Sequence, residues 1–192
     1  MLTTLDTVKA ELGITDTSLD TYLTRAINAA SEQIEGHCGR VFGSRTVSEV
    51  FRLDRCRPRI MLNHWPVTAV GSVTEDGAAV PEAERPIEDG IFLRRLDGDG
   101  ADSLWTAAKI EVSYTAGYVL PAAEGANLPA DVEQACIDLV RLRYHAKDRD
   151  PALKSEKILD VIAQSWDTGG TDGGQTAAVL ATLDRYRRVV IA

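Results

Sequence analysis

The chain has 192 residues, of which 44% are hydrophobic and 26% charged, and its formal net charge is −8. This hydrophobic content is too high for a wholly disordered chain. It allows a core of ordinary size that needs no disulfide or metal site for its stability. The negative charge argues against a protein whose main task is to bind nucleic acid, because phosphate binding requires an excess of cations. The length suits one domain with an appendage, or two very small domains.

No apolar run approaches the roughly 18–20 residues that cross a bilayer, and the start of the chain lacks the charged-then-apolar pattern of a signal peptide. We therefore expect that the protein does not contact a membrane, and that it is made and kept in a cytoplasm. The three cysteines, Cys38, Cys56 and Cys136, form no C-x-x-C pair. They are expected to be buried free thiols rather than parts of a disulfide framework or zinc ribbon.

Two helices are predicted at the start of the chain. The first covers residues 5–12, with a threonine cap at position 3 or 4 and Gly13 as its stop. The second follows the capping stretch 15–18 and ends at Gly36. Its apolar stripe repeats at helical spacing and consists of Leu19, Tyr22, Leu23, Ala26, Ile27, Ala30 and Ile34.

From about residue 45 the apolar period shortens toward two, which predicts short antiparallel strands as far as residue 118. Ile110, Val112 and Tyr114 alternate most clearly. These strands carry little apolar surface of their own, so we expect them to pack on the helices. Turn signals separate them at Glu75-Asp76-Gly77, Asp89-Gly90 and Asp97-Gly98-Asp99-Gly100.

A third helix is predicted from Pro129 to about Lys147, because proline is favoured at a helix start. Residues 157–166 are ambiguous between a short strand and an extended arm. Residues 167–176 are rich in glycine and predict a flexible linker. Residues 176–188 then predict a short helix whose apolar face is formed by Val179, Leu180, Leu183 and Tyr186.

The acidic stretch 97–102 has the spacing with which a calcium-binding EF-hand loop begins. That loop requires a glycine at its sixth position and a glutamate at its twelfth, where this sequence has Asp102 and Ala108. An acidic hairpin turn is the better interpretation.

Other reactive residues match no established catalytic or metal-binding pattern. His37, Cys38, Cys56 and His64 have no zinc-site spacing. The glycine-rich stretch 169–176 has P-loop spacing but carries Gln175 where the phosphate-binding lysine is required. We therefore expect no catalytic residue, no cofactor and no metal.

Charge is distributed unevenly along the chain. Residues 73–102 contain nine acids against three arginines, residues 45–59 contain five arginines, and the tail carries three more. Two interpretations remain open: solvated loops and helix faces, or charge complementarity between copies or partners.

Several patterns, in this order, resemble the head–tail connector (adaptor) family of tailed bacteriophages. No single motif is specific; the order and spacing carry the resemblance over nearly the whole chain, except for residues 167–175 and the extended tail. The patterns are Leu5-x-x-Val8-Lys9-x-x-Leu12, Leu19 to Ile34 with Gly39-Arg40, Trp65-Pro66-Val67, Val112-Ser113-Tyr114-Thr115-Ala116-Gly117-Tyr118, Leu128-Pro129 with Ala135, Leu139-Val140 and Tyr144, and Leu183-Asp184-Arg185-Tyr186-Arg187-Arg188.

The resemblance implies an α+β fold: a mainly helical core of three to four helices, an inserted antiparallel β region and an extended C-terminal arm. The implied parts are a connector body at 1–166 (helical core 1–40 and 128–148, β insertion 45–118), a linker at 167–176 and a docking arm at 177–192.

The resemblance also implies a structural virion protein without enzymatic activity, assembled in the host cytoplasm. It would form a dodecameric ring at the head–tail junction, beneath the portal protein, and join the DNA-filled head to the tail or the next neck protein. DNA would pass through the channel without specific binding. The implied portal-binding residues are Val179, Leu180, Leu183, Arg185, Tyr186, Arg187, Arg188, Val189, Val190 and Ile191.

Two functions of other classes remain as alternatives. One is a small metal-dependent or hydrolytic enzyme with an unrecognised site around His37, Cys38 and the 97–102 loop. The other is a regulatory helical binding module. For the segment after Gly174 we expect a tethered helix that orders only on docking, because glycine pairs precede it and it is short. The alternative is that this helix folds back onto its own core.

Overall fold

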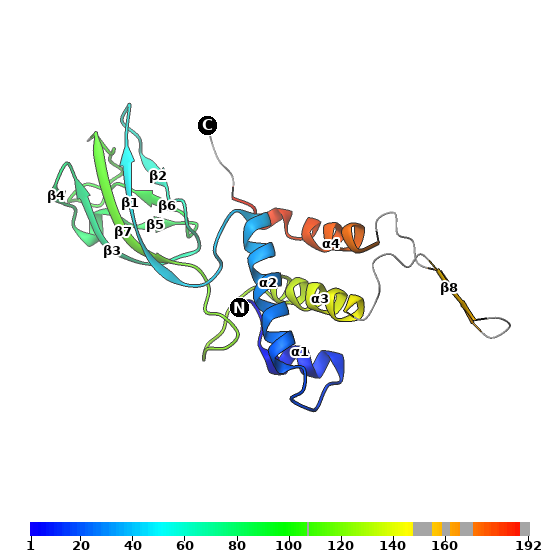
Figure 1. Cartoon of the computed structure of the whole chain (residues 1–192). Coiled ribbons are helices and arrows are strands. Elements are labelled where there is room, and N and C mark those ends of the chain that lie inside the picture. Colours follow the sequence, from blue (N-terminus) through cyan, green and yellow to red (C-terminus); the bar gives the residue numbers. More distant parts are fainter. Residues whose placement is uncertain (107, 148–154, 159–161, 166–170, 189–192) are drawn as a thin grey trace. The chain divides into compact units, whose positions relative to one another are not determined.

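The structure is a computed structural model that describes residues 1–106, 108–147, 155–158, 162–165 and 171–188. The chain divides into two compact units, shown in Figure 1. The helical unit comprises Met1–Arg40 and Leu120–Ala192, and the β unit comprises Val41–Val119. Helices together with antiparallel sheets confirm the predicted α+β fold class.

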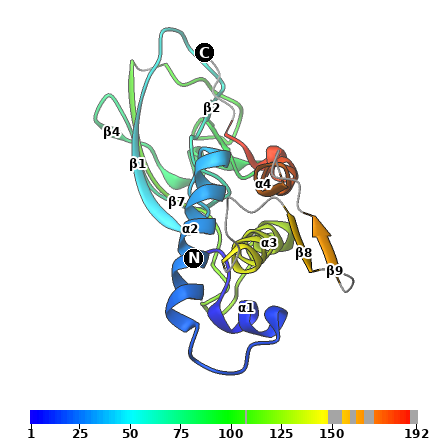
Figure 2. The ribbon, with the colours of Figure 1, turned by 45° about the vertical axis from the view of Figure 1, so that its right-hand side comes forward.

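The described α-helices all belong to the helical unit. α2 contacts both α1 and α3, and α4 packs against α3 (Figure 2). No described helix is long and apolar enough to cross a membrane. The helices are α1 (Leu5–Leu12), α2 (Asp20–Cys38), α3 (Ala130–Ala146) and α4 (Thr171–Ala181), followed by the 3-10 turn η2 (Asp184–Tyr186). In the ambiguous region, β8 (Ser155–Ile158) pairs with β9 (Ile162–Ser165) as an antiparallel hairpin.

Local signals explain the ends of the first two helices. The Thr4 side chain accepts a hydrogen bond from the Thr7 backbone N–H, and Gly13 closes α1 in the left-handed conformation, as predicted. The predicted end of α2 at Gly36 is wrong, because the helix continues to Cys38. Gly39 is the residue with left-handed φ (63°), and its N–H bonds to the Gly36 carbonyl. Gly36 therefore remains inside the last helical turn.

The core of the helical unit lies between α2 and α3. The predicted stripe of α2 is buried at Leu23, Ile27 and Ile34, and α3 contributes Val132 and Leu139. These are residues whose burial stabilises a fold by about 1.5–3 kcal/mol each. The helical periodicity of the sequence therefore identified the face that packs.

The β unit contains two antiparallel sheets. One has the strand order β1-β7-β3-β4 and the other the order β2-β6-β5. β1 and β7 pair without interruption, from Arg45 opposite Ala116 to Arg52 opposite Lys109. The elements are β1 (Arg45–Arg52), β2 (Arg59–Met61), β3 (Val67–Glu75), β4 (Ala78–Ala79), η1 (Glu82–Glu84), β5 (Ile87–Glu88), β6 (Phe92–Arg94) and β7 (Lys109–Ala116).

The expectation that the strands carry little apolar surface of their own is wrong, because the β unit has its own hydrophobic core. Trp105 is fully buried, and its indole Nε1–H donates to the Leu93 carbonyl at 3.2 Å. A buried indole combines a large apolar area with a satisfied polar group, which stabilises a small sandwich. The core residues are Ile60, Leu62, Val73, Val80, Leu93, Trp105, Ile110, Val112, Tyr114 and Ala116.

The cysteine prediction is correct for two of the three residues. Cys38 and Cys136 are buried free thiols, whereas Cys56 is exposed. Cys56 lies in the irregular segment between β1 and β2, where arginines and Asp54 surround it in sequence. Leu53 of the same segment packs against the core of the β unit, whereas Cys56 does not.

Gly117 is the backbone position that a side chain would disturb most directly. Its φ is +113°, and a Cβ there would lie 2.6 Å from the Gly43 carbonyl oxygen. We expect Gly117→Ala to destabilise the β unit by about 2–3 kcal/mol or more, measured by chemical denaturation. Gly100→Ala is the matched control: its φ is +83° but the space around it is open. An equal loss in both variants would contradict the proposed clash.

Candidate assembly surfaces

The residues of the enzyme alternative each have a structural partner. The His37 Nε2 lies 2.9 Å from Asp184 Oδ1, and the Cys38 thiol is buried near the Leu183 carbonyl. Among the described residues, no group of three or more His, Cys, Asp or Glu side chains could hold a metal ion. His37 and Cys38 thus serve the packing of the C-terminal segment in the helical unit.

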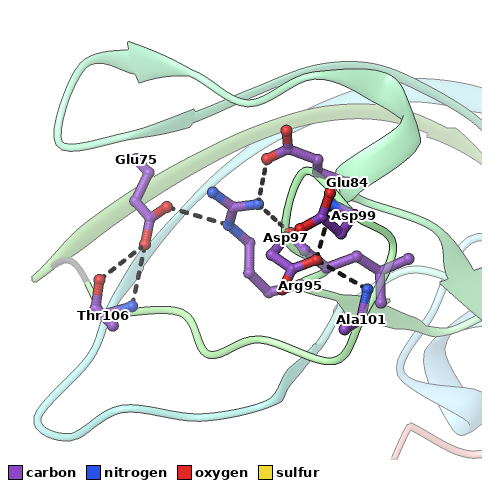
Figure 3. Close-up of polar contacts among 8 residues, drawn as sticks. Glu75, Glu84, Arg95, Asp97, Asp99, Ala101 and Thr106 are labelled. Carbon is purple, nitrogen blue, oxygen red and sulfur yellow. Dashed lines mark hydrogen bonds and ion pairs between the residues drawn. The ribbon is translucent and has the colours of Figure 1, made fainter.

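The 97–102 stretch forms the predicted acidic hairpin turn. The Asp97 carboxylate accepts hydrogen bonds from the backbone N–H groups of Asp99 (3.0 Å) and Ala101 (2.9 Å), as Figure 3 shows. Leu96 and Asp102 pair across the turn as an antiparallel bridge. Asp97 is therefore oriented toward its own backbone, the usual role of an aspartate that opens a turn.

Arg95 neutralises part of the acidic stretch from within. Its guanidinium lies between Glu75 (3.3 Å) and Glu84 (2.6 Å), and only 18% of its side chain is exposed (Figure 3). The Glu75 carboxylate also accepts a hydrogen bond from the Thr106 backbone N–H at 3.0 Å. This network joins β3, η1 and the segment after β6, so these charges hold the β unit together.

Arg94 and Arg59 neutralise two further acids. Arg94 pairs with Asp102, and both Arg94 (3.8 Å) and Arg59 (3.4 Å) lie beside Glu88. The uneven charge seen in the sequence is therefore partly balanced inside the β unit. Fewer of these charges are therefore available for contacts with partners than the sequence alone suggests.

The C-terminal segment packs against the end of α2. Leu183 is fully buried, and the backbone N–H of Arg188 donates to the Cys38 carbonyl at 2.8 Å. This bond satisfies one of the carbonyls that a helix leaves unpaired at its C-terminus. The expectation that the segment is tethered rather than packed is wrong here, and the alternative of a fold-back onto the core is what the structure has.

The predicted linker is also wrong in its second half. α4 begins at Thr171, so residues 171–176 are helical. Glycine lowers helix stability by about 1 kcal/mol relative to alanine, but packing of α4 against α3 outweighs this preference. Residues 167–170 lie outside the described residues.

The predicted docking residues occupy different environments. Val179, Leu180 and Tyr186 are half-buried and Leu183 is buried, while three arginines remain exposed. The exposed ones are Arg185, Arg187 and Arg188. The other predicted docking residues, Val189, Val190 and Ile191, lie outside the described residues.

Asp131, at the start of α3, binds two residues of this segment. Tyr186 Oη donates to the carboxylate at 2.8 Å, and Arg185 forms an ion pair with it. Burial favours the neutral carboxyl, but these two contacts outweigh it and lower the pKa of Asp131. Burial and the same hydrogen bond raise the pKa of Tyr186. Sequence reasoning missed this role, because a helix-start aspartate carries no signal for partners more than 50 residues away.

These pKa shifts predict how the contact depends on pH. A carboxyl with a lowered pKa stabilises the folded state above its unfolded value near ~4 and loses this contribution as the pH falls through the folded pKa. A phenol with a raised pKa contributes below ~10 and loses its contribution as the pH rises through the folded pKa. We expect the NMR signals of the Leu183 and Arg188 amides to shift on acidification below pH ~4. Asp131→Asn should remove this acid transition, and an unchanged transition would assign it to another group.

A cavity of about 90 Å³ lies between α2, α3 and α4. Arg143 lines it, but its guanidinium donates to the Ala26 carbonyl (3.1 Å) and to Gln33 Oε1 (2.7 Å). Small-molecule sites usually measure roughly 300–1,000 Å³. The cavity is too small for such a ligand, and the guanidinium of Arg143 already donates to groups of the protein. Both observations fit a packing defect better than a ligand site.

Comparison with known proteins was made on sequence and on structure. Residues 1–155 match the family model described as head completion protein. Curated protein sequences give no significant match. The fold is similar to a chain in the neck of an empty gene transfer agent (GTA) particle computed with C6 symmetry: the TM-score is 0.57, the identity 19%, and the match covers 100% of this chain and 92% of that chain.

Two further solved structures are similar. A chain of the native GTA virion has a TM-score of 0.52 and 20% identity, with 100% of this chain and 92% of that chain covered. A chain in the native GTA neck computed with C12 symmetry has a TM-score of 0.50 and 22% identity, with coverage of 91% and 86%. At such identities the likeness establishes the fold. The family match spans most of the chain and confirms the resemblance seen in the sequence: this chain belongs to the head completion protein family.

Proposed function

We propose that this protein is a structural component of a virion-like particle, located at the head–tail junction, where it joins the DNA-filled head to the tail or the next neck protein. The family match over residues 1–155 is the observation that carries this proposal. The similarity of the fold to chains from GTA necks supports it. The proposed role is assembly without catalysis, since the residues considered for chemistry serve turns, ion pairs and packing.

The protein acts as a ring of identical copies, and we propose twelve. The similar neck chains come from assemblies computed with C6 and C12 symmetry, which supports a ring and is compatible with that number. A ring requires two different surfaces on each copy, because head-to-tail contacts are heterologous. DNA passes through the channel without specific binding, consistent with the net charge of −8.

The C-terminal end is the proposed contact with the portal protein. Its anchor is the buried Leu183, held beside Cys38, while Arg187 and Arg188 stay exposed. An anchored base presents Arg187 and Arg188 in a defined direction, which lowers the entropic cost of docking. The proposed docking residues are thus the exposed arginines and residues 189–192, and Leu183 positions them.

Shortening the chain tests this contact. We expect deletion of residues 189–192 combined with Arg187→Glu and Arg188→Glu to abolish co-sedimentation with portal rings of the same particle. The fold should survive, because Leu183 and the Asp131 contacts remain. Arg141→Glu, on the exposed surface of α3, is the control for general charge effects. If the shortened chain still binds portal rings, the proposed role of the C-terminal end in portal binding is wrong. The proposed ring would not be affected by this result.

A further inference from the structure

The strands β8 and β9 form a sheet of their own in the helical unit. Their antiparallel register runs from Ser155 opposite Ser165 to Ile158 opposite Ile162, so each strand has four residues. Among the strands that the structure describes, none pairs with the outer edge of either one. The hairpin also makes no extensive contact with any described helix. Within the described part of the chain, both of its edges therefore present backbone N–H and C=O groups to no partner strand.

A hairpin of this size is not stable by itself. An isolated pair of strands is marginal in water, and a third strand or a covering helix is needed for independent stability. The hairpin begins at residue 155, where the match to the head completion protein model ends. The group that completes it therefore comes from outside the described part of the chain, and the family match assigns it no role.

A ring of identical copies completes both edges at once. The two edges differ, since one belongs to β8 and the other to β9, and a ring is built from contacts between two different surfaces. Rotation about the ring axis leaves the direction of each strand along that axis unchanged. When the hairpins stand side by side, β9 of one copy therefore runs antiparallel to β8 of the next copy, which is the geometry of an antiparallel β ladder.

We propose that the β8–β9 hairpins of neighbouring copies pair edge to edge, β9 of one copy with β8 of the next, and close into a β barrel around the ring axis. The inference rests on the proposed ring function. A closed barrel leaves no strand edge unpaired. A single strand from another neck protein would fill one edge of the hairpin and leave the other open. Two copies joined only through their β8 strands would leave both β9 edges open.

The number of strands connects this barrel with the passage of DNA. Twelve copies would contribute 24 strands, and at a spacing of ~4.8 Å such a barrel is roughly 37 Å across. Barrels of about 8 strands are filled by their own side chains, whereas those of about 16–18 strands enclose a water-filled channel. The proposed barrel is wider than these and has an open lumen, as a ring through which DNA passes requires. Six copies would give a barrel only about half as wide.

The short strands make pairing depend on the ring. Four-residue edges, one of which includes Lys157, are poor templates for contact between free copies, because short strands and lysine discourage edge-to-edge pairing. A ring holds neighbouring hairpins at a high effective concentration, so each weak ladder forms between strands that are already aligned. The barrel is therefore expected in the assembled ring and not between free copies.

Cross-linking within assembled particles tests the barrel. All chains carry Cys56→Ser, and they are a mixture of chains with Glu156→Cys on β8 and chains with Gln164→Cys on β9. Because each chain has only one of these two thiols, no link can form within a hairpin. The remaining thiols react slowly, because burial raises the pKa of Cys38 and Cys136.

The expected product of a short bismaleimide linker is a dimer that joins position 156 of one chain to position 164 of another. Opposite Cβ atoms on paired strands lie about 4.5–5.5 Å apart, so the yield should be roughly tenfold or more above that of either variant alone. In the matched control, Thr21→Cys at an exposed position of α2 replaces Glu156→Cys and should give only background.

The other outcomes would overturn the barrel. A dimer formed by Glu156→Cys alone would show β8 paired with β8, and a product with another neck protein would show a different occupant of the edge. If electron cryo-microscopy shows a ring of this chain in the same particles while the yield stays at background, the proposed function survives and only the barrel fails. Particles without such a ring would refute the proposed function, and the barrel with it.

Discussion

Replacing Trp105 with alanine is expected to unfold the β unit under conditions in which the helical unit stays folded. The indole is fully buried and donates to the Leu93 carbonyl. Removing a buried aromatic side chain of this size costs about 3–5 kcal/mol, which is comparable with the whole stability of a small domain. Two separate transitions in chemical denaturation, with only the β-unit transition shifted, would be the expected result.

Leu104→Ala is the matched control for this variant. Leu104 adjoins Trp105 in sequence, but 47% of it is exposed. Its replacement should change stability by no more than about 0.5 kcal/mol. Equal effects at the two positions would contradict the assignment of Trp105 to the core of the β unit.

Leu183→Ala is expected to release the C-terminal segment from the end of α2. Leu183 is fully buried and its carbonyl faces the Cys38 thiol, so the loss should be about 2–5 kcal/mol for this segment. Amide hydrogen exchange should report it as faster exchange at Arg188, whose N–H bonds to the Cys38 carbonyl. Because the base of the proposed docking arm would lose its direction, portal binding should weaken too.

Leu180→Ala provides the comparison for this release. Leu180 is only half-buried on α4, so its replacement should cost less than that of Leu183. If Leu183→Ala left the exchange at Arg188 as slow as in the wild type, the segment would not depend on this anchor. That result would support the tethered arm that the glycine content predicts.

Local signals in the sequence were sufficient for several elements. The Thr4 cap, the Gly13 stop and the apolar stripe of α2 predicted two helices, because capping and periodicity act over a few residues. The alternation at Ile110, Val112 and Tyr114 predicted the central strand β7. The acidic turn at Asp97 was also predicted, since an aspartate that opens a turn bonds to its own loop.

Long-range packing decided the features that the sequence did not reveal. Trp105 lies between irregular segments, so no periodicity identified it as the centre of a core. The glycines at the start of α4 indicated flexibility, but contact with α3 makes that segment helical. The binding of Tyr186 by Asp131 joins residues 55 positions apart, a separation at which neither spacing nor propensity carries information.

The role of the charges could not be decided from the sequence for a related reason. The sequence shows how many acids and arginines lie in each stretch, whereas pairing depends on strand register and on side-chain direction. Arg95 is held between Glu75 and Glu84, which come from two other elements. Ion pairs of this kind become visible only once the strands are paired.

Electron cryo-microscopy of intact particles containing this chain tests the central claim most directly. The account predicts a closed ring of this fold at the head–tail junction, in contact with the portal on one side and with the next neck or tail protein on the other. Complete, DNA-filled particles that lack the chain, or that carry it away from this junction, would contradict the account.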